Sequence, residues 1–352
     1  MASYPEYISK KRHLVPAPER LVVHGKATFG TFSEALPEIN LLDSVKPCGK
    51  RMPAFMNRSR LTVWQAFEVS FKEGMFISAV YNMNAIGFGI FVFFDKRTGK
   101  VRRWFQLEPG RKCLVAENLL NSKTEIKNEN FDFTITNRFK DGFATAKGFG
   151  IDKKNGKFEL DMKITSVSAP SVVNIPFDDN KSLYSHKELF SAEGYVTVDG
   201  ETFVADSDSA AIIDDHKGFY PFIAHYDWLT TMGKIQHNGK EEYFGFNLTR
   251  NQSVNQDDYN ENLIWFGDKQ FLLPPVSFEK NGGRWHVTDE HGKVDVYFDI
   301  TDTYVMRVPV GGICINYKLP FGKLSGYLCG YDGERYVLDG MDGAGEDKTT
   351  RI

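Results

Sequence analysis

Short runs of alternating apolar and polar residues follow one another along the chain, and glycine-containing turns separate them. Four such runs lie between residues 63 and 107, and three lie between residues 131 and 164. Between the last two runs, Asn155-Gly156 can take the positive φ angles of a tight hairpin turn. Period-two alternation with such turns predicts antiparallel β-hairpins.

The same pattern returns in the second half of the chain, where Gly267-Asp268 and His291-Gly292 mark two hairpin turns. Helical periodicity is scarce, and the sequence predicts short helices only at Ser33–Leu42 and His186–Ala192. The strands expected in this half cover residues 195–198, 202–205, 264–266, 270–273, 284–288, 293–298, 310–317, 325–330 and 335–338.

These patterns divide the chain into two β-rich halves with irregular segments around them. Regularly spaced antiparallel strands are typical of sandwiches and barrels, and a barrel removes exposed strand edges while enclosing a pocket. The expected fold is therefore all-β, with two antiparallel barrel halves and few short helices. The expected segments are an irregular N-terminal segment (1–55), a first barrel-like half (56–168), a connection (169–190), a second barrel-like half (191–338) and a flexible tail (339–352).

Composition narrows the class of protein. Aromatic residues make up 14% of the 352 residues, which favours strands over helices. A net charge of −3 gives no electrostatic footprint for nucleic acid. No window approaches the ~18 apolar residues of a membrane span, and no signal peptide is visible at the N-terminus, so a cytoplasmic location is expected.

Sequence motifs for metals and cofactors are missing. The four cysteines are dispersed without a close pair, so we expect buried free thiols and no metal site. No phosphate-loop, dinucleotide-binding or nucleophile-elbow motif occurs, and no cofactor is expected. An acidic group before Leu263 lacks the spacing of a calcium loop.

Carboxylates, imidazoles and aromatic rings gather between residues 214 and 262. Within the predicted strand Phe222–Trp228, period two places Tyr226 and Trp228 on one face and His225 and Asp227 on the other. A mixture of this kind within a β-scaffold is typical of a ligand pocket or an acid–base site. Asp214, Asp215 and His216 precede Lys217-Gly218 and alternatively form a solvated turn.

A second predicted strand, Tyr243–Thr249, has an apolar and a polar face. We expect the face with Phe244 and Phe246 to pack against the other half of the molecule. The face with Gly245 and Asn247 would then line the barrel, where the glycine leaves room for a ligand.

Glu261 is the leading candidate for a general acid or base, because Asn260 and Asn262 flank it and can orient its carboxyl group. His225 and Asp227 are expected to support it as a same-face pair. Alternatively, Glu261 accepts hydrogen bonds from backbone or from Arg or Lys and closes the preceding loop. The residues expected to bind substrate are Tyr226, Trp228, Asn247, Tyr220 and Trp64, with core packing as the alternative for Trp64.

Several of these segments resemble a family known as domain of unknown function 2804. The resemblance runs through Arg60–Phe67, Lys217–Pro221, Gly245–Thr249 and Leu273–Val276, and covers roughly residues 40 to 330. The family is distantly similar to proteins built from two lipocalin-like (calycin-type) barrels, including carotenoid 1,2-hydratases, tocopherol cyclases and pericyclic cyclases. This resemblance implies two barrels of that type and an apolar substrate protonated in the cleft between them.

Three functions remain open on these observations. The first is a cofactor-independent hydratase or cyclase, of the lyase or isomerase class, in which burial keeps a carboxyl group protonated as a general acid. The second is a non-catalytic carrier of a small apolar molecule. The third is a carbohydrate-active enzyme that pairs Glu261 with Asp227.

Overall fold

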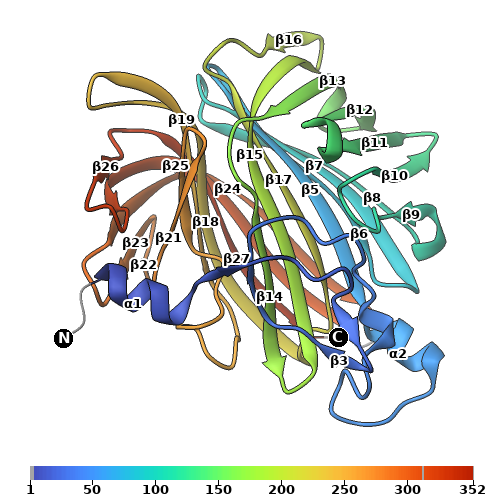
Figure 1. Cartoon of the computed structure of the whole chain (residues 1–352). Coiled ribbons are helices and arrows are strands. Elements are labelled where there is room, and N and C mark those ends of the chain that lie inside the picture. The colour runs from blue at the N-terminus through green and yellow to red at the C-terminus, as the bar shows by residue number, and fades with distance from the viewer. Residues whose placement is uncertain (1–3, 311–312, 352) are drawn as a thin grey trace.

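The chain folds almost entirely into antiparallel β-sheet. The computed structural model describes residues 4–310 and 313–351. Two sheets, of 15 and 10 strands, lie side by side, and β18 (Ile223–His237) of the smaller sheet runs against β17 (Ala210–Gly218) and β5 (Thr62–Phe71) of the larger one (Figure 1). The expectation of an all-β fold with few short helices is confirmed.

The larger sheet is a nearly closed barrel. Its two ends meet where Gly87 lies against the thiol of Cys113. Its main path runs in the order β8 (Lys100–Pro109), β7 (Ile86–Asp95), β6 (Gly74–Asn82), β5, β17, β15 (Lys181–Val198), β13 (Gly156–Ser166), β12 (Phe143–Asp152), β11 (Phe131–Arg138), β10 (Ser122–Asn128) and β9 (Cys113–Leu114). Side branches are β14 (Ser171–Asp178), β4 (Gly30–Phe32), β1 (Leu14–Val15) and β16 (Glu201–Val204).

The smaller sheet is a half-barrel, and its strands are joined in antiparallel register throughout. The path runs in the order β21 (Lys269–Leu272), β20 (Leu263–Phe266), β19 (Lys240–Arg250), β18, β27 (Asp342–Arg351), β25 (Ile313–Cys329), β24 (Val294–Val310), β23 (Arg284–Asp289) and β22 (Val276–Asn281), with β26 (Arg335–Val337) on β25. A separate hairpin joins β2 (Val22–Val23) and β3 (Lys26–Ala27).

The α-helices of the described ranges are α1 (Tyr4–Lys11) and α2 (Ala54–Arg60), and neither is long and apolar enough to cross a membrane. The helices predicted elsewhere were wrong. Ser33–Leu42 is mostly loop, and His186–Ala192 lies inside β15. That stretch is buried on both sides of its sheet, so the period-two pattern that identifies a strand is lost.

Two further segments differ from the sequence-based expectation. The expected connection, residues 169–190, contains β14 and the first half of β15. The expected tail contains β27, which pairs with β18 on one side and with β25 on the other. The many charged residues of this segment are typical of a mobile terminus, yet β27 lies in the middle of the smaller sheet.

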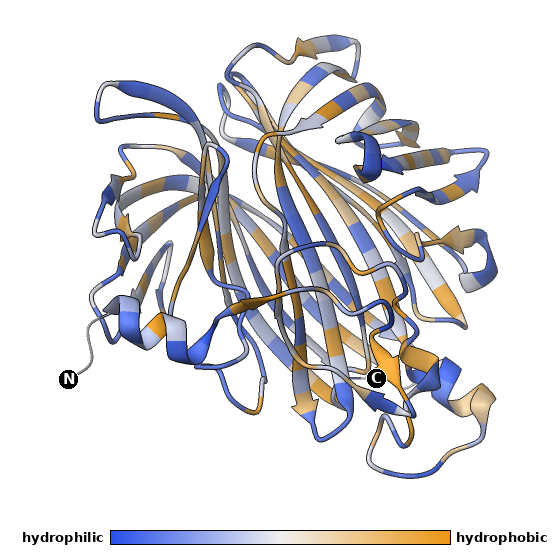
Figure 2. Cartoon of the chain, viewed as in Figure 1, coloured by the Kyte–Doolittle hydropathy of each residue, from blue (hydrophilic) through white to orange (hydrophobic). Residues whose placement is uncertain are grey.

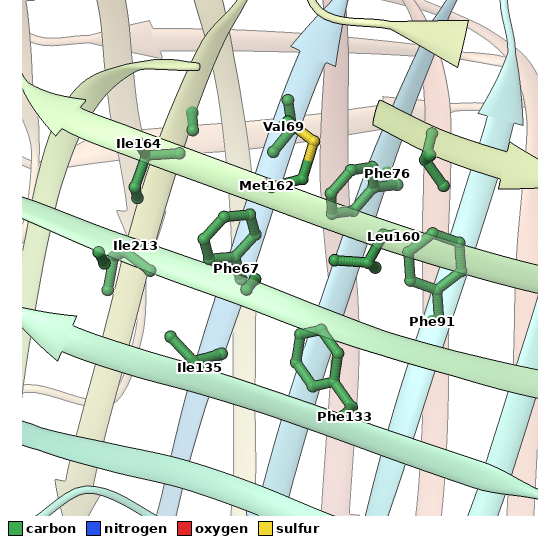
Figure 3. Packing of buried hydrophobic residues seen from close by; sticks show 14 of the residues in the cluster. Phe67, Val69, Phe76, Phe91, Phe133, Ile135, Leu160, Met162, Ile164 and Ile213 are labelled. Atoms are coloured by element: carbon green, nitrogen blue, oxygen red, sulfur yellow. The ribbon is translucent and has the colours of Figure 1, made fainter. Parts of the chain in front are cut away.

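Three apolar cores account for this architecture. One fills the larger barrel and includes Phe67 and Phe91 (Figure 3), and one lies within the concave smaller sheet. The third lies between the sheets and takes Trp64 and Ala66 from β5 and Trp228 from β18. Apolar and polar positions alternate along many strands, as Figure 2 shows, but β5 and β17, which lie between two cores, are buried on both faces.

The orientation predicted for β19 was inverted. Phe244, Phe246 and Leu248 belong to the core of the smaller sheet itself and do not pack against the other half. Gly245 instead faces the larger sheet, where an added Cβ would lie 3.2 Å from Leu189. The polar face of β19 therefore points into the space between the two sheets.

The N-terminal segment holds both sheets together. Arg12, which follows α1, donates hydrogen bonds to the Asn260 side chain and to the carbonyls of Asn262 and Leu273 in the smaller half. Further along, β4 pairs with β14 of the larger sheet.

Candidate functional site

A cleft between the two sheets forms two adjoining pockets. The first, here called the aromatic pocket, is lined by Trp64, Tyr81, Phe88, Tyr226 and Tyr317 among others. The centre of a water-sized sphere can move within a volume of about 60 Å³ in this pocket, which leaves room for a few water molecules. The second, here called the charged pocket, is lined by Lys187, Asp214, His216 and Glu261 among others. The residues that line both pockets are Trp64, Asp214, Tyr220, Ala224, Tyr226, Trp228 and Glu346.

Stacked rings form one wall of the aromatic pocket. The Trp64 and Tyr81 ring centroids lie 5.2 Å apart at an interplanar angle of 19°, and Tyr81 stacks on Phe88 at 4.6 Å and 15°. The indole N–H of Trp64 donates to the Tyr220 hydroxyl at 3.1 Å. These side chains leave a flat apolar surface with their polar atoms already bonded.

The opposite wall comes from the smaller sheet. Ala224, Tyr226 and Trp228 face the cleft, as the period-two reading of this segment predicts. Trp228 Nε1 donates to Asn247 Oδ1 at 2.7 Å, and Asn247 Nδ2 donates to the Glu261 carbonyl at 2.9 Å. The structure thus brings the five predicted substrate-binding residues to one region, with Asn247 behind Trp228.

Glu68 places a carboxyl group in the aromatic pocket, and no ion-pair partner lies within 4.0 Å of it among the described residues. Glu68 shares the cleft-facing side of β5 with Trp64 and Ala66, and is 2% exposed. Burial raises the pKa of Glu68 well above its ordinary value, and the carboxylates of Asp214 and Glu346 raise it further. Glu68 Oε2 has no hydrogen-bond partner within residues 4–310 and 313–351. These effects favour the neutral, protonated form of Glu68 in an apolar cavity.

The charged pocket is organised around Lys187, which is 2% exposed. Its Nζ lies 3.0 Å from Asp214 Oδ1, 2.8 Å from Glu261 Oε2 and 2.7 Å from His216 Nε2. Burial lowers the pKa of Lys187, but Asp214 and Glu261 outweigh that effect and raise it above its ordinary value. Burial alone would raise the pKa of Asp214, but Lys187 and His216 outweigh this effect and lower that pKa below its usual range. Both shifts favour the ionised forms of Lys187 and Asp214.

Glu261 lies where the sequence placed the leading acid–base candidate, although its surroundings differ. It is 1% exposed, and its Oε2 accepts from Lys187, as in the alternative reading in which a basic side chain fixes it. Glu261 lines the charged pocket, and its other oxygen, Oε1, is buried and lacks a hydrogen-bond partner in the part of the chain that the structure describes.

Only one member of the supporting pair is brought to Glu261: His225 lines the charged pocket with Glu261, whereas Asp227 does not. Asp227 lies on the face of β18 opposite Trp228 and forms a short ion pair with Lys280. His225 lies at the rim, 3.4 Å from Asp227. His225, Asp227 and Asp347 have ligand atoms within 4.8 Å of one another, but the Lys280 ammonium also lies 3.2 Å from Asp347. A lysine therefore takes the place that a metal ion would need.

Several site residues were missed by sequence reasoning. Glu68 and Lys187 are charged residues at inward-facing strand positions. The alternating pattern of Val63–Phe71 could have indicated this for Glu68, but no such pattern surrounds Lys187. Asp214 and His216 were interpreted as a possible turn, yet they share one face of β17. Glu346 and Lys348 lay in the expected tail.

Comparison with known proteins places the chain in a family. Among solved structures, it is similar to kievitone hydratase from Nectria haematococca (TM-score 0.49, 10% identity, covering 82% of this chain and 88% of that one). It is also similar to CghA with Sch210972 (TM-score 0.49, 8% identity, covering 96% of this chain and 98% of that one). A third similar structure is a putative AttH from Nitrosomonas europaea (TM-score 0.41, 12% identity, covering 82% of this chain and 92% of that one). A comparison with curated proteins finds no match. Domain of unknown function (DUF2804) matches residues 14–352, so the chain belongs to that family, as its motifs indicated.

Proposed function

We propose that the cleft binds a small apolar molecule and that Glu68 protonates it in a cofactor-independent hydration or cyclisation. The observation that carries this proposal is the buried carboxyl group of Glu68, whose Oε2 has no hydrogen-bond partner among the described residues, in a cavity walled by aromatic rings. A carboxylic acid kept protonated by an apolar site can donate its proton at neutral pH, where an exposed glutamate cannot.

Aromatic faces suit the charge that such a reaction develops. Protonation of an alkene leaves positive charge on carbon, and the faces of Trp64, Tyr81 and Phe88 attract a cation. Water or an internal nucleophile then adds to that carbon and releases a proton. Glu261 Oε1, unpartnered within the described ranges, would accept that proton, while Lys187 holds the carboxylate in place.

A non-catalytic carrier is the second candidate, and the charged pocket is the observation that favours it. Asp214 and Glu261 both pair with Lys187, so the cluster also fits a purely structural role. The carbohydrate-active reading loses its support, because Asp227 turns away from the cleft toward Lys280.

Ligand binding is tested first with a fluorescent apolar probe, N-phenyl-1-naphthylamine. We expect its emission to rise on mixing with the protein, and Ala224→Phe, which fills the wall shared by both pockets, to weaken binding at least tenfold. Val204→Phe, at a position 67% exposed, is the matched control and should bind like the parent. Equal binding by all three proteins would show that the probe does not occupy the cleft.

Catalysis is tested separately, with a panel of aryl alkenes and polyenes in isotope-labelled water. The proposal predicts a product that carries the label or has cyclised, formed by the parent and at least ~100-fold more slowly by Glu68→Gln. Probe binding without turnover of any panel member would favour the carrier.

A further inference from the structure

Lys348 places an amine in the wall of the aromatic pocket, where the acid–base chemistry proposed above does not use it. Its Nζ donates to the Tyr81 hydroxyl at 3.2 Å. The same nitrogen lies 4.5 Å from the ring centroid of Tyr81, 5.4 Å from that of Tyr226 and 5.8 Å from that of Tyr317. Three tyrosine rings from both sheets therefore surround one amine.

The nitrogen has no ion-pair partner within 4.0 Å among residues 4–310 and 313–351. Its neighbour on the same face of β27, Glu346, accepts a short hydrogen bond from the Tyr317 hydroxyl instead. Burial lowers the pKa of the Lys348 ammonium to about 8, and the Glu346 charge opposes this only in part. At neutral pH about one amine in ten is then free of its proton, compared with fewer than one in a thousand for an exposed lysine.

We propose that Lys348 is a nucleophilic amine that forms an imine with an apolar aldehyde or ketone held in the aromatic pocket. This inference rests on the proposed function, because it names the carbonyl class of the small molecule that the cleft would bind. A desolvated lysine in an apolar site is how proteins make an amine reactive toward carbonyl groups.

The covalent step is balanced without any further reactant. The Nζ lone pair of Lys348 attacks the carbonyl carbon, and the C=O π electrons move to oxygen, which takes a proton to give a carbinolamine. The C–O bond then breaks, oxygen leaves as water with a second proton, and a C=N bond remains. One water molecule is released for each imine formed. The Glu346 carboxylate and the tyrosine faces would stabilise the protonated imine.

The charges of the pocket favour a neutral carbonyl compound over an anion. Asp214 and Glu346 line the same cavity as Lys348, and a ligand carboxylate would lie in their field. An iminium ion also withdraws electrons more strongly than its parent carbonyl, so a conjugated alkene becomes easier to attack by water. Imine formation would thus serve the hydration proposed for this cleft.

The test is reductive trapping with decanal and sodium cyanoborohydride, followed by peptide mapping by mass spectrometry. When the aldehyde concentration is limiting, we expect one decyl group on Lys348. Near neutral pH, the extent of labelling of Lys348 should exceed that of any exposed lysine by about tenfold or more. Labelling of Lys348 should rise through about pH 8, the value to which burial lowers its pKa. Glyceraldehyde, which is polar, should show no such preference.

Variants separate reactivity from folding. Lys348→Arg keeps the positive charge but cannot form an imine, so its decyl label in the Lys348 peptide should vanish. Lys318→Arg, at an exposed site on the adjoining strand, is the matched control and should label like the parent. Retention of N-phenyl-1-naphthylamine binding by Lys348→Arg verifies that the cleft is intact; if it is lost, Lys348→Gln is measured in the same way.

The outcomes distinguish this inference from the proposal beneath it. If decanol displaces the fluorescent probe but decanal gives no Lys348 adduct, imine formation is rejected while cleft binding stands. Equal total labelling of the parent and Lys348→Arg, with all of the label on surface lysines, also rejects it. If neither decanol nor decanal enters the cleft, both proposals fail together.

Discussion

The Trp64 indole lies flat against the His216 imidazole, with ring centroids 4.3 Å apart and planes 11° apart. One face of Trp64 thus touches the charged pocket, while Tyr81 stacks on it within the aromatic pocket. A ligand that moves Trp64 therefore also moves a ring within hydrogen-bond reach of Lys187. The two pockets are linked through this side chain.

Substitution of Trp64 should separate its hydrogen bond from its packing. Trp64→Phe keeps an aromatic ring but leaves the Tyr220 hydroxyl without its donor, which should cost about 1 kcal/mol of unfolding free energy. Trp64→Ala also empties the stack and should cost about 3–5 kcal/mol. Urea denaturation measures both, and equal losses for the two variants would show that the stack contributes nothing.

Glu68 should destabilise the fold at neutral pH. Its folded-state pKa is raised, so above about pH 4.3 the unfolded chain releases a proton that the folded chain keeps. Stability then falls as pH rises toward the folded pKa, by about 1.4 kcal/mol for each unit between the two pKa values.

Glu68→Gln removes that penalty, so its gain in melting temperature over the parent should grow as pH rises above about 4.3. Glu193→Gln, at an exposed position, is the control and should show no such gain. A Glu68→Gln variant that loses stability relative to the parent as pH rises would indicate a carboxylate held by a favourable partner.

Lys187 should carry a large share of local stability. Lys187→Met leaves Asp214 and Glu261 buried without a cation, which should cost about 3–5 kcal/mol in chemical denaturation. Lys147→Met, which breaks an exposed pair with Asp161, is the control and should change stability far less.

Acid should abolish the Lys187 effect. The folded pKa of Asp214 is lowered, so its pairing contributes above the unfolded value of about 3.9 and is lost as pH falls through the folded value. The gap between parent and Lys187→Met should therefore narrow below about pH 4. A gap that stays constant would mean that packing of the lysine stem, and not its charge, causes the loss.

Trp228 should report ligand in the cleft. Energy transfer from tryptophan to bound N-phenyl-1-naphthylamine should fall in Trp228→Phe and nearly vanish when Trp64→Phe is added, because both indoles line the two pockets. Trp104→Phe, in the core of the larger barrel, is the control and should retain most of the transfer. If Trp228→Phe responds to the probe as the parent does, Trp228 does not lie at the binding site.

Much of the fold was predictable because its turns are local. Asn155-Gly156 occupies a hairpin turn with Gly156 at φ 75°, as the sequence indicates. Alternation also placed Tyr226 and Trp228 on one face correctly. Both signals need only neighbouring residues.

What the sequence did not reveal depends on contacts between distant segments. Asp214 and His216 are hydrophilic, so the sequence gives no sign that they lie on a buried central strand. They can be buried there because they pair with Lys187 on the neighbouring strand. Lys348 looks like part of a mobile terminus until β18 and β25 enclose it. The prediction that Phe244 packs against the other half was wrong. Alternation shows which residues share a face of a strand, but it does not show which core that face contacts.

The protonation state of Glu68 decides the central claim, and it is measured without a substrate. An infrared difference spectrum between the parent and Glu68→Gln at neutral pH should contain the carbonyl stretch of a protonated carboxylic acid, present in the parent and missing from the variant. That result would place a neutral acid in the aromatic pocket, where it can donate a proton. A difference spectrum that contains only the paired bands of an ionised carboxylate would contradict it.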